Sequence, residues 1–165
     1  EFLTGLVMKK TNGMAVPQIV KTLIKKELKI SIVYVLSMGG SICARICEDG
    51  SVASSDGSVL KPMLDSFFSS KQENEAVEYL SGARYQLISV GQILSEEIEP
   101  ADWALLIAEI SSRIAAGIAS GIVIAHGTDT LAYTASLLFW LFSDAGVPIV
   151  LTASTETPDK SREAQ

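Results

Sequence analysis

Cysteine and histidine are scarce in this sequence of 165 residues, which contains two cysteines, Cys43 and Cys47, and one histidine, His126. Two cysteines are too few for a disulfide framework, and a lone histidine without a cysteine cluster is a poor metal site. These shortages exclude a disulfide-stapled secreted domain. We expect reduced thiols in a cytoplasmic protein, no metal or other cofactor, and a hydrogen-bonded structural role for His126.

Long apolar runs are also missing. The uncharged stretch at residues 131–142 is too short to span a bilayer, and no charged-then-apolar signal segment precedes the cysteines. No membrane is therefore expected as a partner. The helix predicted at 130–143 is apolar nearly all round, which indicates burial on more than one side, so we expect a homo-oligomer, either a dimer or a tetramer.

Positive charge is in deficit, with 13 basic and 19 acidic residues and a formal net charge of −6. An acidic surface repels phosphate, which argues against a duplex nucleic acid as partner. Six lysines nevertheless fall within the first 29 residues, namely Lys9, Lys10, Lys21, Lys25, Lys26 and Lys29. Their pattern favours the solvated face of a helix over an RNA-binding patch.

The remaining composition, 48% hydrophobic and 19% charged, is that of an ordinary globular protein, and 165 residues correspond to about one domain. The chain begins without Met, so Met8 and Met14 are candidate starts. It ends on "TPDKSREAQ" without a closing element, and we expect further chain downstream.

Strand and helix patterns alternate along the sequence. Residues 16–27 predict an amphipathic helix in a leading segment, 1–28, and residues 29–165 predict an α/β domain. β-branched runs predict strands at 29–37, 84–90, 121–126 and 146–154, of which the first two are expected to be buried. Further helices are predicted at 61–70, 100–119 and 130–143, and the charged residues 71–80 either extend the first of these or form another helix.

This alternation requires an open, mainly parallel sheet with helices on both faces and right-handed crossovers, that is, a Rossmann-like or flavodoxin-like α/β fold. Residues 42–60 contain Asp49-Gly50 and Asp56-Gly57, which predict two turns and a mobile hairpin or loop.

Ligands of such folds bind at the carboxyl ends of the strands. The strand-end loops here are "SMGGSI", "GQILSEE", "HGTDT" and "TASTETPDK", and all four carry hydroxyls. In the first loop, the glycines allow a sharp turn and Ser41 presents a hydroxyl just beyond the strand. A plain glycine turn with a serine cap is an equally good interpretation, whereas a phosphate-binding loop lacks the G-x-G-x-x-G or G-K-[ST] pattern.

The "HGTDT" loop allows two interpretations as well. Gly127 makes the turn, and either Thr128 or Asp129 caps the following helix. A cap needs only one of them, so the other polar groups are free to face Ser41 across the crevice. A Ser-His-Asp hydrolase is disfavoured because no G-x-S-x-G motif accompanies His126.

Three motifs, "MGGSI", "LSEEIEPADW" and "HGTDTLAYTAS", together resemble the amino-terminal domain of the bacterial-type L-asparaginases, whose motifs are T-G-G-T-I and H-G-T-D-T. The resemblance covers residues 31–154. By this resemblance, Ser41 takes the place of the nucleophilic threonine and Thr128 that of the second catalytic threonine. Asp129 matches the aspartate that belongs to the Thr-Lys-Asp set and also binds the α-amino group of the substrate.

The resemblance also implies binding residues and a reaction. Gly40 lies in the substrate-binding turn, Ser95 falls where the family holds the substrate α-carboxylate, and Glu96 stands beside it. The implied reaction is hydroxyl attack on a side-chain amide, formation of an acyl-enzyme ester, release of ammonia and hydrolysis by water, with backbone N–H groups stabilising the oxyanion.

Several positions depart from the family pattern. Met38 replaces the first threonine of T-G-G-T-I, and the family's loop tyrosine and its arginine-proline pair have no counterpart in this sequence. The family's catalytic lysine is not matched either, since Lys160 comes too early.

Three functions therefore remain open. The first is an amidohydrolase of L-asparagine, or of L-glutamine, that releases the acid and ammonia. The second is the ammonia-producing, asparaginase-like subunit of the glutamyl-tRNA(Gln) amidotransferase, which would bring tRNA as a partner. The third is a non-catalytic ligand-binding or scaffold domain derived from the same fold.

Overall fold

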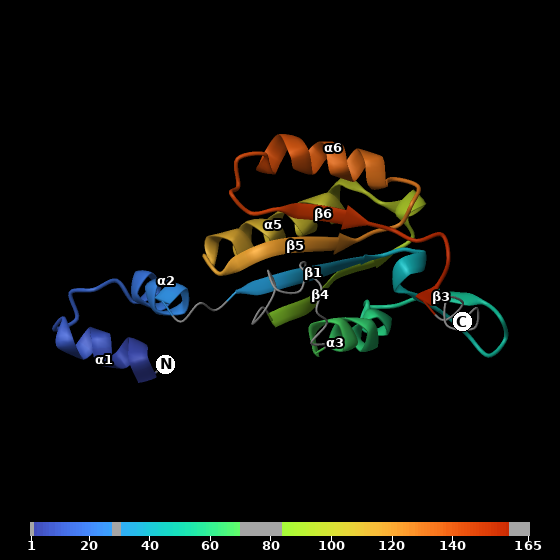
Figure 1. The fold of residues 1–165 in the computed structure, drawn as a ribbon. Helices are drawn as coiled ribbons and strands as arrows, with labels where there is room; N and C mark the ends of the chain where they lie inside the picture. Colours follow the sequence, from blue (N-terminus) through green and yellow to red (C-terminus); the bar gives the residue numbers. More distant parts are fainter. Residues whose placement is uncertain (1, 28–30, 70–83, 159–165) are drawn as a thin grey trace.

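The computed structural model describes residues 2–27, 31–69 and 84–158 (Figure 1). Its helices are α1 (Phe2–Lys10), α2 (Pro17–Glu27), α3 (Lys61–Ser69), α5 (Pro100–Ala115) and α6 (Leu131–Phe142). Its strands are β1 (Ile32–Gly39), β2 (Ala44–Ile46), β3 (Val52–Ser54), β4 (Arg84–Ile93), β5 (Ala119–Ala125) and β6 (Ile149–Thr152). The described residues also contain three single turns of 3-10 helix: η1 (Ser41–Cys43), η2 (Ser58–Leu60) and η3 (Ser95–Glu97). The helix predicted over residues 71–80 lies outside the described residues.

Four strands form one parallel sheet in the order β4-β1-β5-β6, so the predicted parallel α/β fold is confirmed. After β1 the chain crosses to β4 on one side and then returns to β5 on the other. Strand order thus reverses between β1 and β5, which is the switch point where open α/β sheets bind ligands. The loops after these two strands are "GGSI" and "HGTD".

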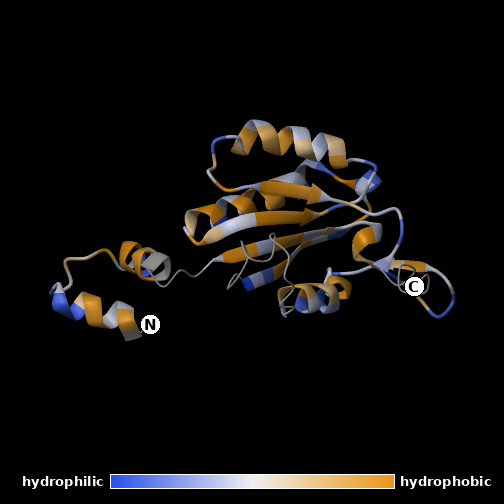
Figure 2. Ribbon diagram, viewed as in Figure 1, coloured by the Kyte–Doolittle hydropathy of each residue, from blue (hydrophilic) through white to orange (hydrophobic). Residues whose placement is uncertain are grey.

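One face of the sheet carries the hydrophobic core. Alternate residues of a strand point to opposite faces, and on this face the buried side chains are Tyr34, Leu36, Met38, Ile122 and Ile124. Leu106 and Ile110 of α5 and Leu138 of α6 pack against them. In Figure 2, β5, β6 and the helix α6 that lies over them are coloured largely as hydrophobic.

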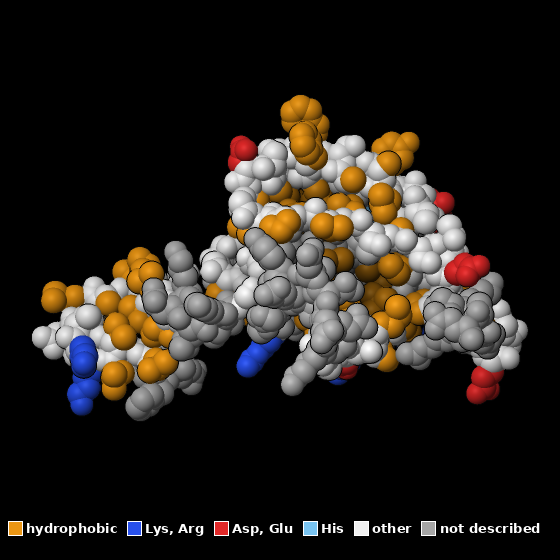
Figure 3. All heavy atoms as spheres, in the orientation of Figure 1, with side chains coloured by type: hydrophobic (Ala, Val, Ile, Leu, Met, Phe, Trp, Pro, Cys, Tyr) orange, Lys and Arg blue, Asp and Glu red, His pale blue; other side chains and the backbone are white. Residues whose placement is uncertain are grey.

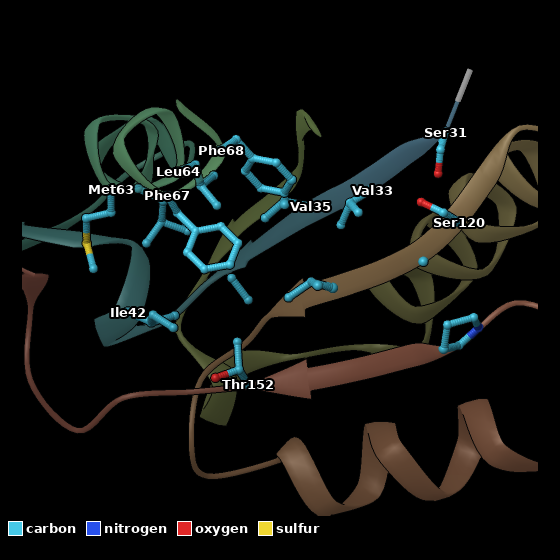
Figure 4. Close-up of a pocket in the computed structure, with 15 residues that line it drawn as sticks. Ser31, Val33, Val35, Ile42, Met63, Leu64, Phe67, Phe68, Ser120 and Thr152 are labelled. Atoms are coloured by element: carbon cyan, nitrogen blue, oxygen red, sulfur yellow. The ribbon is translucent and has the colours of Figure 1, made fainter. Parts of the chain in front are cut away.

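The opposite face is covered by α3 only in part, among the described residues. Beside that helix lies an apolar groove of about 630 Å³, floored by Val33, Val35 and Val123 and walled by Leu64, Phe67 and Phe68 (Figure 4). Figure 3 shows apolar side chains gathered in a hollow on this side of the molecule. Helices on both faces were predicted correctly, but their cover is unequal.

Several predicted boundaries were wrong by a few residues, and two of these errors have a clear physical reason. The helix expected over 100–119 ends at Ala115, because Gly117 adopts φ 67°, the left-handed conformation that commonly ends a helix. The strand expected over 84–90 continues to Ile93, whose backbone pairs with Gly39 after a register shift. Its residues alternate between exposed and half-buried, so the expected buried strand is an edge strand of this sheet.

Two peripheral parts match their predictions. The amphipathic helix expected at 16–27 is α2, which packs against α1 to one side of the sheet (Figure 1). The hairpin expected within 42–60 is the antiparallel pair β2–β3. In the described part of the chain, no helix combines the length and the apolar character needed to cross a membrane.

Candidate active site

Three strand-end turns meet at the carboxyl edge of the sheet, and glycines make the approach possible. Gly40, at φ 72°, lies so close to the turn after β5 that an added Cβ would stand 2.5 Å from the Cα of Gly127. Gly39, at φ 110°, lies in the same way against the backbone of Ile93, and a Cβ on Gly127 would overlap the side chain of Ser95. Glycines therefore let the turns after β1 and β5 approach backbone to backbone, and the small side chain of Ser95 fits between the turns after β4 and β5.

Asp129 is oriented by Ser95. The Ser95 hydroxyl donates a hydrogen bond of 2.7 Å to Oδ2 of Asp129 and accepts one of 3.2 Å from the Asp129 backbone N–H. Ser95 is buried, whereas Asp129 is exposed. This pair joins the turn after β4 to the turn after β5 and fixes the direction of one carboxylate at the edge of the sheet.

The interpretation of Thr128 or Asp129 as a helix cap was wrong. The N-cap of α6 is Thr130, and no side chain caps the helix by a hydrogen bond. The Thr130 hydroxyl instead donates to the backbone carbonyl of Ser95 at 2.8 Å. Because the cap position falls one residue later than expected, the side chains of Thr128 and Asp129 are both available at the sheet edge.

Ser41 and Thr128 supply the two hydroxyls of the site. Ser41 is half-buried and begins the 3-10 turn directly after Gly40, and Thr128 is exposed directly after Gly127. The contact between Gly40 and Gly127 therefore brings the backbones that carry the two hydroxyls side by side. Among the described residues, neither hydroxyl has a hydrogen-bond partner.

Two other positions singled out in the sequence make no hydrogen bond, among the described residues, to these two hydroxyls or to Asp129. Glu96, the middle residue of η3, is exposed next to the buried Ser95. Met38 is 3% exposed and belongs to the core on the α5 and α6 face. Met38 therefore occupies a packing position, and no polar group at the edge of the sheet is lost by its presence.

His126 is buried at the end of β5 and hydrogen-bonded on both ring nitrogens, so its predicted structural role is confirmed. Its Nδ1 lies 2.8 Å from the carbonyl oxygen of Gly127, and its Nε2 lies 3.0 Å from the Thr134 hydroxyl of α6. Trp103 of α5 donates from its indole nitrogen to the same hydroxyl at 2.9 Å. Thr134 and Trp103 were missed from the sequence. The signal available was a threonine inside the apolar run 131–142, since buried hydroxyls need partners.

The apolar groove is a separate region. It contains Ile42 and Thr152, which lie near the carboxyl edge, but none of Ser41, Thr128 and Asp129. This groove is therefore not where the polar groups converge. Within the same described residues, no cluster of three or more His, Cys, Asp or Glu side chains is arranged to hold a metal ion.

This geometry defines a class of site: two hydroxyls and an oriented carboxylate at the switch point of a parallel α/β sheet. Residues 32–163 match the family described as Asparaginase, N-terminal. The chain belongs to that family.

Curated relatives and solved structures agree with this assignment. The chain is 34% identical over 158 residues to a glutamyl-tRNA(Gln) amidotransferase subunit of Aeropyrum pernix, and the match covers 94% of the chain and 34% of the relative. It is 42% identical over 94 residues to the corresponding amidotransferase subunit of Haloquadratum walsbyi, covering 56% of the chain and 21% of the relative. The chain thus spans about a third or less of the length of these relatives.

Two solved structures have the same fold. The thermostable L-asparaginase from Thermococcus kodakarensis superimposes with a TM-score of 0.54 at 28% identity, over 76% of this chain and 34% of that one. L-asparaginase I from Vibrio cholerae superimposes with a TM-score of 0.59 at 26% identity, over 81% of this chain and 36% of that one. The chain is therefore similar both to amidotransferase subunits and to free asparaginases.

Proposed function

We propose that this chain forms the hydroxyl-bearing half of an amidohydrolase site that releases ammonia from L-glutamine for a glutamyl-tRNA(Gln) amidotransferase in the cytoplasm. Two observations support the proposal: the close approach of Gly40 and Gly127, which directly precede Ser41 and Thr128, and the hydrogen bond from Ser95 to Asp129. The amidotransferase context is supported by the names of the curated relatives, which are subunits of that enzyme.

The proposed reaction balances as a two-step acyl transfer. The Ser41 oxygen bonds to the side-chain amide carbon, and the C–N bond breaks as the nitrogen takes up a proton and leaves as ammonia. Water then adds to the ester, which releases the acid and restores the Ser41 hydroxyl. Thr128 places the second hydroxyl at the reacting group, and the Asp129 carboxylate binds the α-amino group of the substrate.

The test measures ammonia release from glutamine by the full protein together with its copurified partners. Asp129→Asn keeps the shape but removes the charge, and we expect it to lower kcat/KM by about a hundredfold or more. Thr128→Val should lower it to a similar extent. Ser136→Ala removes an exposed α6 hydroxyl that bonds to its own helix, and this matched control should keep full activity. Unchanged release in both site variants would exclude the proposal.

A second candidate, hydrolysis of free L-asparagine by a homo-oligomer, is favoured by the two solved L-asparaginases and by one surface feature. Helix α6 exposes Tyr133, Phe139, Trp140 and Leu141, and apolar side chains project from this helix in Figure 3. A second copy of the chain is the partner proposed for them. Copurification with a distinct subunit and tRNA supports the amidotransferase, whereas a homo-oligomer that prefers asparagine supports this candidate.

A third candidate, a binding domain without turnover, rested partly on Met38 in place of a threonine. Because Met38 lies in the core, that departure no longer counts against catalysis. Calorimetry with glutamate or aspartate separates the alternatives, since heat of binding without any ammonia release would identify a non-catalytic domain.

A further inference from the structure

A buried polar chain connects helices α5 and α6 to the turn that carries Thr128. It runs from the Trp103 indole to the Thr134 hydroxyl, from there to Nε2 of His126, and from Nδ1 of His126 to the carbonyl of Gly127. His126 is 1% exposed and Thr134 is fully buried. The proposed reaction uses none of these side chains directly, so their arrangement needs its own explanation.

The hydrogen positions follow from what each group can do. The Gly127 carbonyl only accepts, so Nδ1 of His126 must carry a hydrogen. The Trp103 indole only donates, so Thr134 accepts from it and keeps its own hydrogen to give. With Nε2 unprotonated, the Thr134 hydroxyl donates to it and every group is satisfied. With both ring nitrogens protonated, the Thr134 hydrogen would have no acceptor in the described residues around it, which is costly in a buried site.

We propose that His126 is a positioning residue, held by Trp103 and Thr134 as the neutral tautomer with its hydrogen on Nδ1, and that its N–H fixes the Gly127–Thr128 peptide. The backbone N–H of His126 is already fixed to the Thr152 carbonyl of β6 at 2.9 Å. The main chain of His126 is thus held by the sheet, and its ring holds the next peptide.

For the candidate site, the consequence of this hydrogen bond is a fixed orientation of the peptide that precedes Thr128. Gly127 has no side chain to restrict it and packs against Gly40 on one side and Ser95 on the other. Without the bond to its carbonyl, the peptide that precedes Thr128 loses one of its restraints. A shift of about 1 Å in a reacting group can lower a rate a hundredfold. The effect on activity rests on the proposed function, whereas the tautomer does not.

The tautomer is measured directly by NMR of the full protein with isotope-labelled histidine. Long-range correlations from the ring carbons' hydrogens distinguish a protonated from an unprotonated ring nitrogen, and the His126 signals are assigned by their loss in His126→Gln. We expect Nδ1 protonated and Nε2 unprotonated at neutral pH. Protonation at Nε2 alone, or at both nitrogens, would overturn the proposal, whether or not the protein hydrolyses an amide.

Two substitutions test the positioning role in the ammonia-release assay. The side-chain amide of His126→Asn reaches the place of Nδ1 and retains a donor for the Gly127 carbonyl. His126→Gln instead reaches the place of Nε2 and retains only the contact with Thr134. We expect kcat to fall about tenfold or more in His126→Gln and less in His126→Asn, with KM changed little in both.

Failure of the positioning role of His126 can be told apart from failure of the proposed amidohydrolase function. If wild-type protein releases no ammonia, the NMR result still decides the tautomer. If His126→Gln is as active as His126→Asn, the carbonyl contact has no positioning role. A second pair, Thr134→Val and Thr134→Ser, removes or keeps the donor to Nε2. In Thr134→Val, Nδ1 should stay protonated because the Gly127 carbonyl still accepts from it, whereas Nε2 loses its hydrogen bond and its nitrogen signal should shift. The Nε2 signal should stay in place in Thr134→Ser, and an unchanged Nε2 signal in Thr134→Val would contradict the role of Thr134.

Discussion

Strands β1 and β5 contribute both to a very close backbone contact and to an open apolar groove. At their carboxyl ends, the backbones of Gly40 and Gly127 are too close to admit a single Cβ. On the face opposite the core, the same two strands floor an apolar groove of about 630 Å³ (Figure 4). The polar groups of the candidate site lie at the tight end and not in the groove.

This difference separates precise positioning of reacting groups from open apolar area, which pocket size alone does not distinguish. Catalytic geometry has to hold to a fraction of an ångström, which is achieved where backbones touch and side-chain rotamers are absent. An open apolar groove offers area but no direction, because it contains few polar groups to orient a substrate. The contrast makes predictions that can be ordered by the size of their effect.

The largest effect is expected for Gly40→Ala. The new Cβ would meet the Gly127 backbone, and the φ of 72° is unfavourable for alanine. We expect the free energy of unfolding to fall by at least about 3 kcal/mol, with loss of ammonia release. Chemical denaturation measures the first effect.

The matched control for this variant is Gly50→Ala. Gly50 has a similar φ of 80° with nothing within 4 Å of an added Cβ. It should lose only the conformational part, about 1–2 kcal/mol. Equal losses in the two variants would show that the turn after β1 can move away from the turn after β5.

A smaller effect is expected when the two faces of β5 are compared. Ile122 is fully buried in the core, and its neighbour Val123 faces the groove and is half-buried. Ile122→Ala should lower the free energy of unfolding by about 2–5 kcal/mol, because a cavity remains. Val123→Ala should cost about 1 kcal/mol, since it removes less buried area and adjoins space that is already open. A larger loss for Val123→Ala would mean that the groove face is filled in solution.

A near-neutral effect is expected for Gly121→Ala. Gly121 also lines the groove, and an added Cβ would stand 3.7 Å from the nearest atom of Pro148, an ordinary contact. Its backbone needs no positive φ. The free energy of unfolding should change by less than about 1 kcal/mol, with a gain favoured by the smaller entropy of the unfolded chain. A loss as large as that of Gly40→Ala would remove the distinction between the two regions.

Much of the fold was predictable because local patterns decide it. The β-branched run of β1 and the apolar period of α5 were recognised, and the sheet class follows from their alternation. The errors at the ends of β4 and α5 have one origin, because the role of a glycine was misjudged in both. Gly91 was taken to end β4, although the strand continues through it, and Gly117 was not taken to end α5.

The candidate site was predictable only as a set of loops. Parallel strands bring their carboxyl ends to one edge, so Ser41, Thr128 and Asp129 were expected there together. The hydrogen bond between Ser95 and Asp129 was not foreseen, because it joins residues 34 apart through the docking of two turns. The bond between Trp103 and Thr134 likewise depends on how α5 and α6 lie on the sheet, which no local pattern specifies.

The mildest test leaves the sequence unchanged and compares how fast the thiols of Cys43 and Cys47 react. Cys43, in the turn after Ser41, is fully buried, accepts a hydrogen bond from the Ser37 hydroxyl at 3.2 Å, and has its pKa raised by burial. Cys47, beyond β2, is partly exposed. Because the thiolate is the reactive form, an alkylating reagent at neutral pH should modify Cys47 first and Cys43 only when the turn opens. Mass spectrometry of peptides over time measures both rates.

Gly40→Ala should speed the modification of Cys43 more than that of Cys47, because it loosens the turn that buries Cys43. Equal rates in the wild-type protein would show that the carboxyl edge opens as readily as the hairpin.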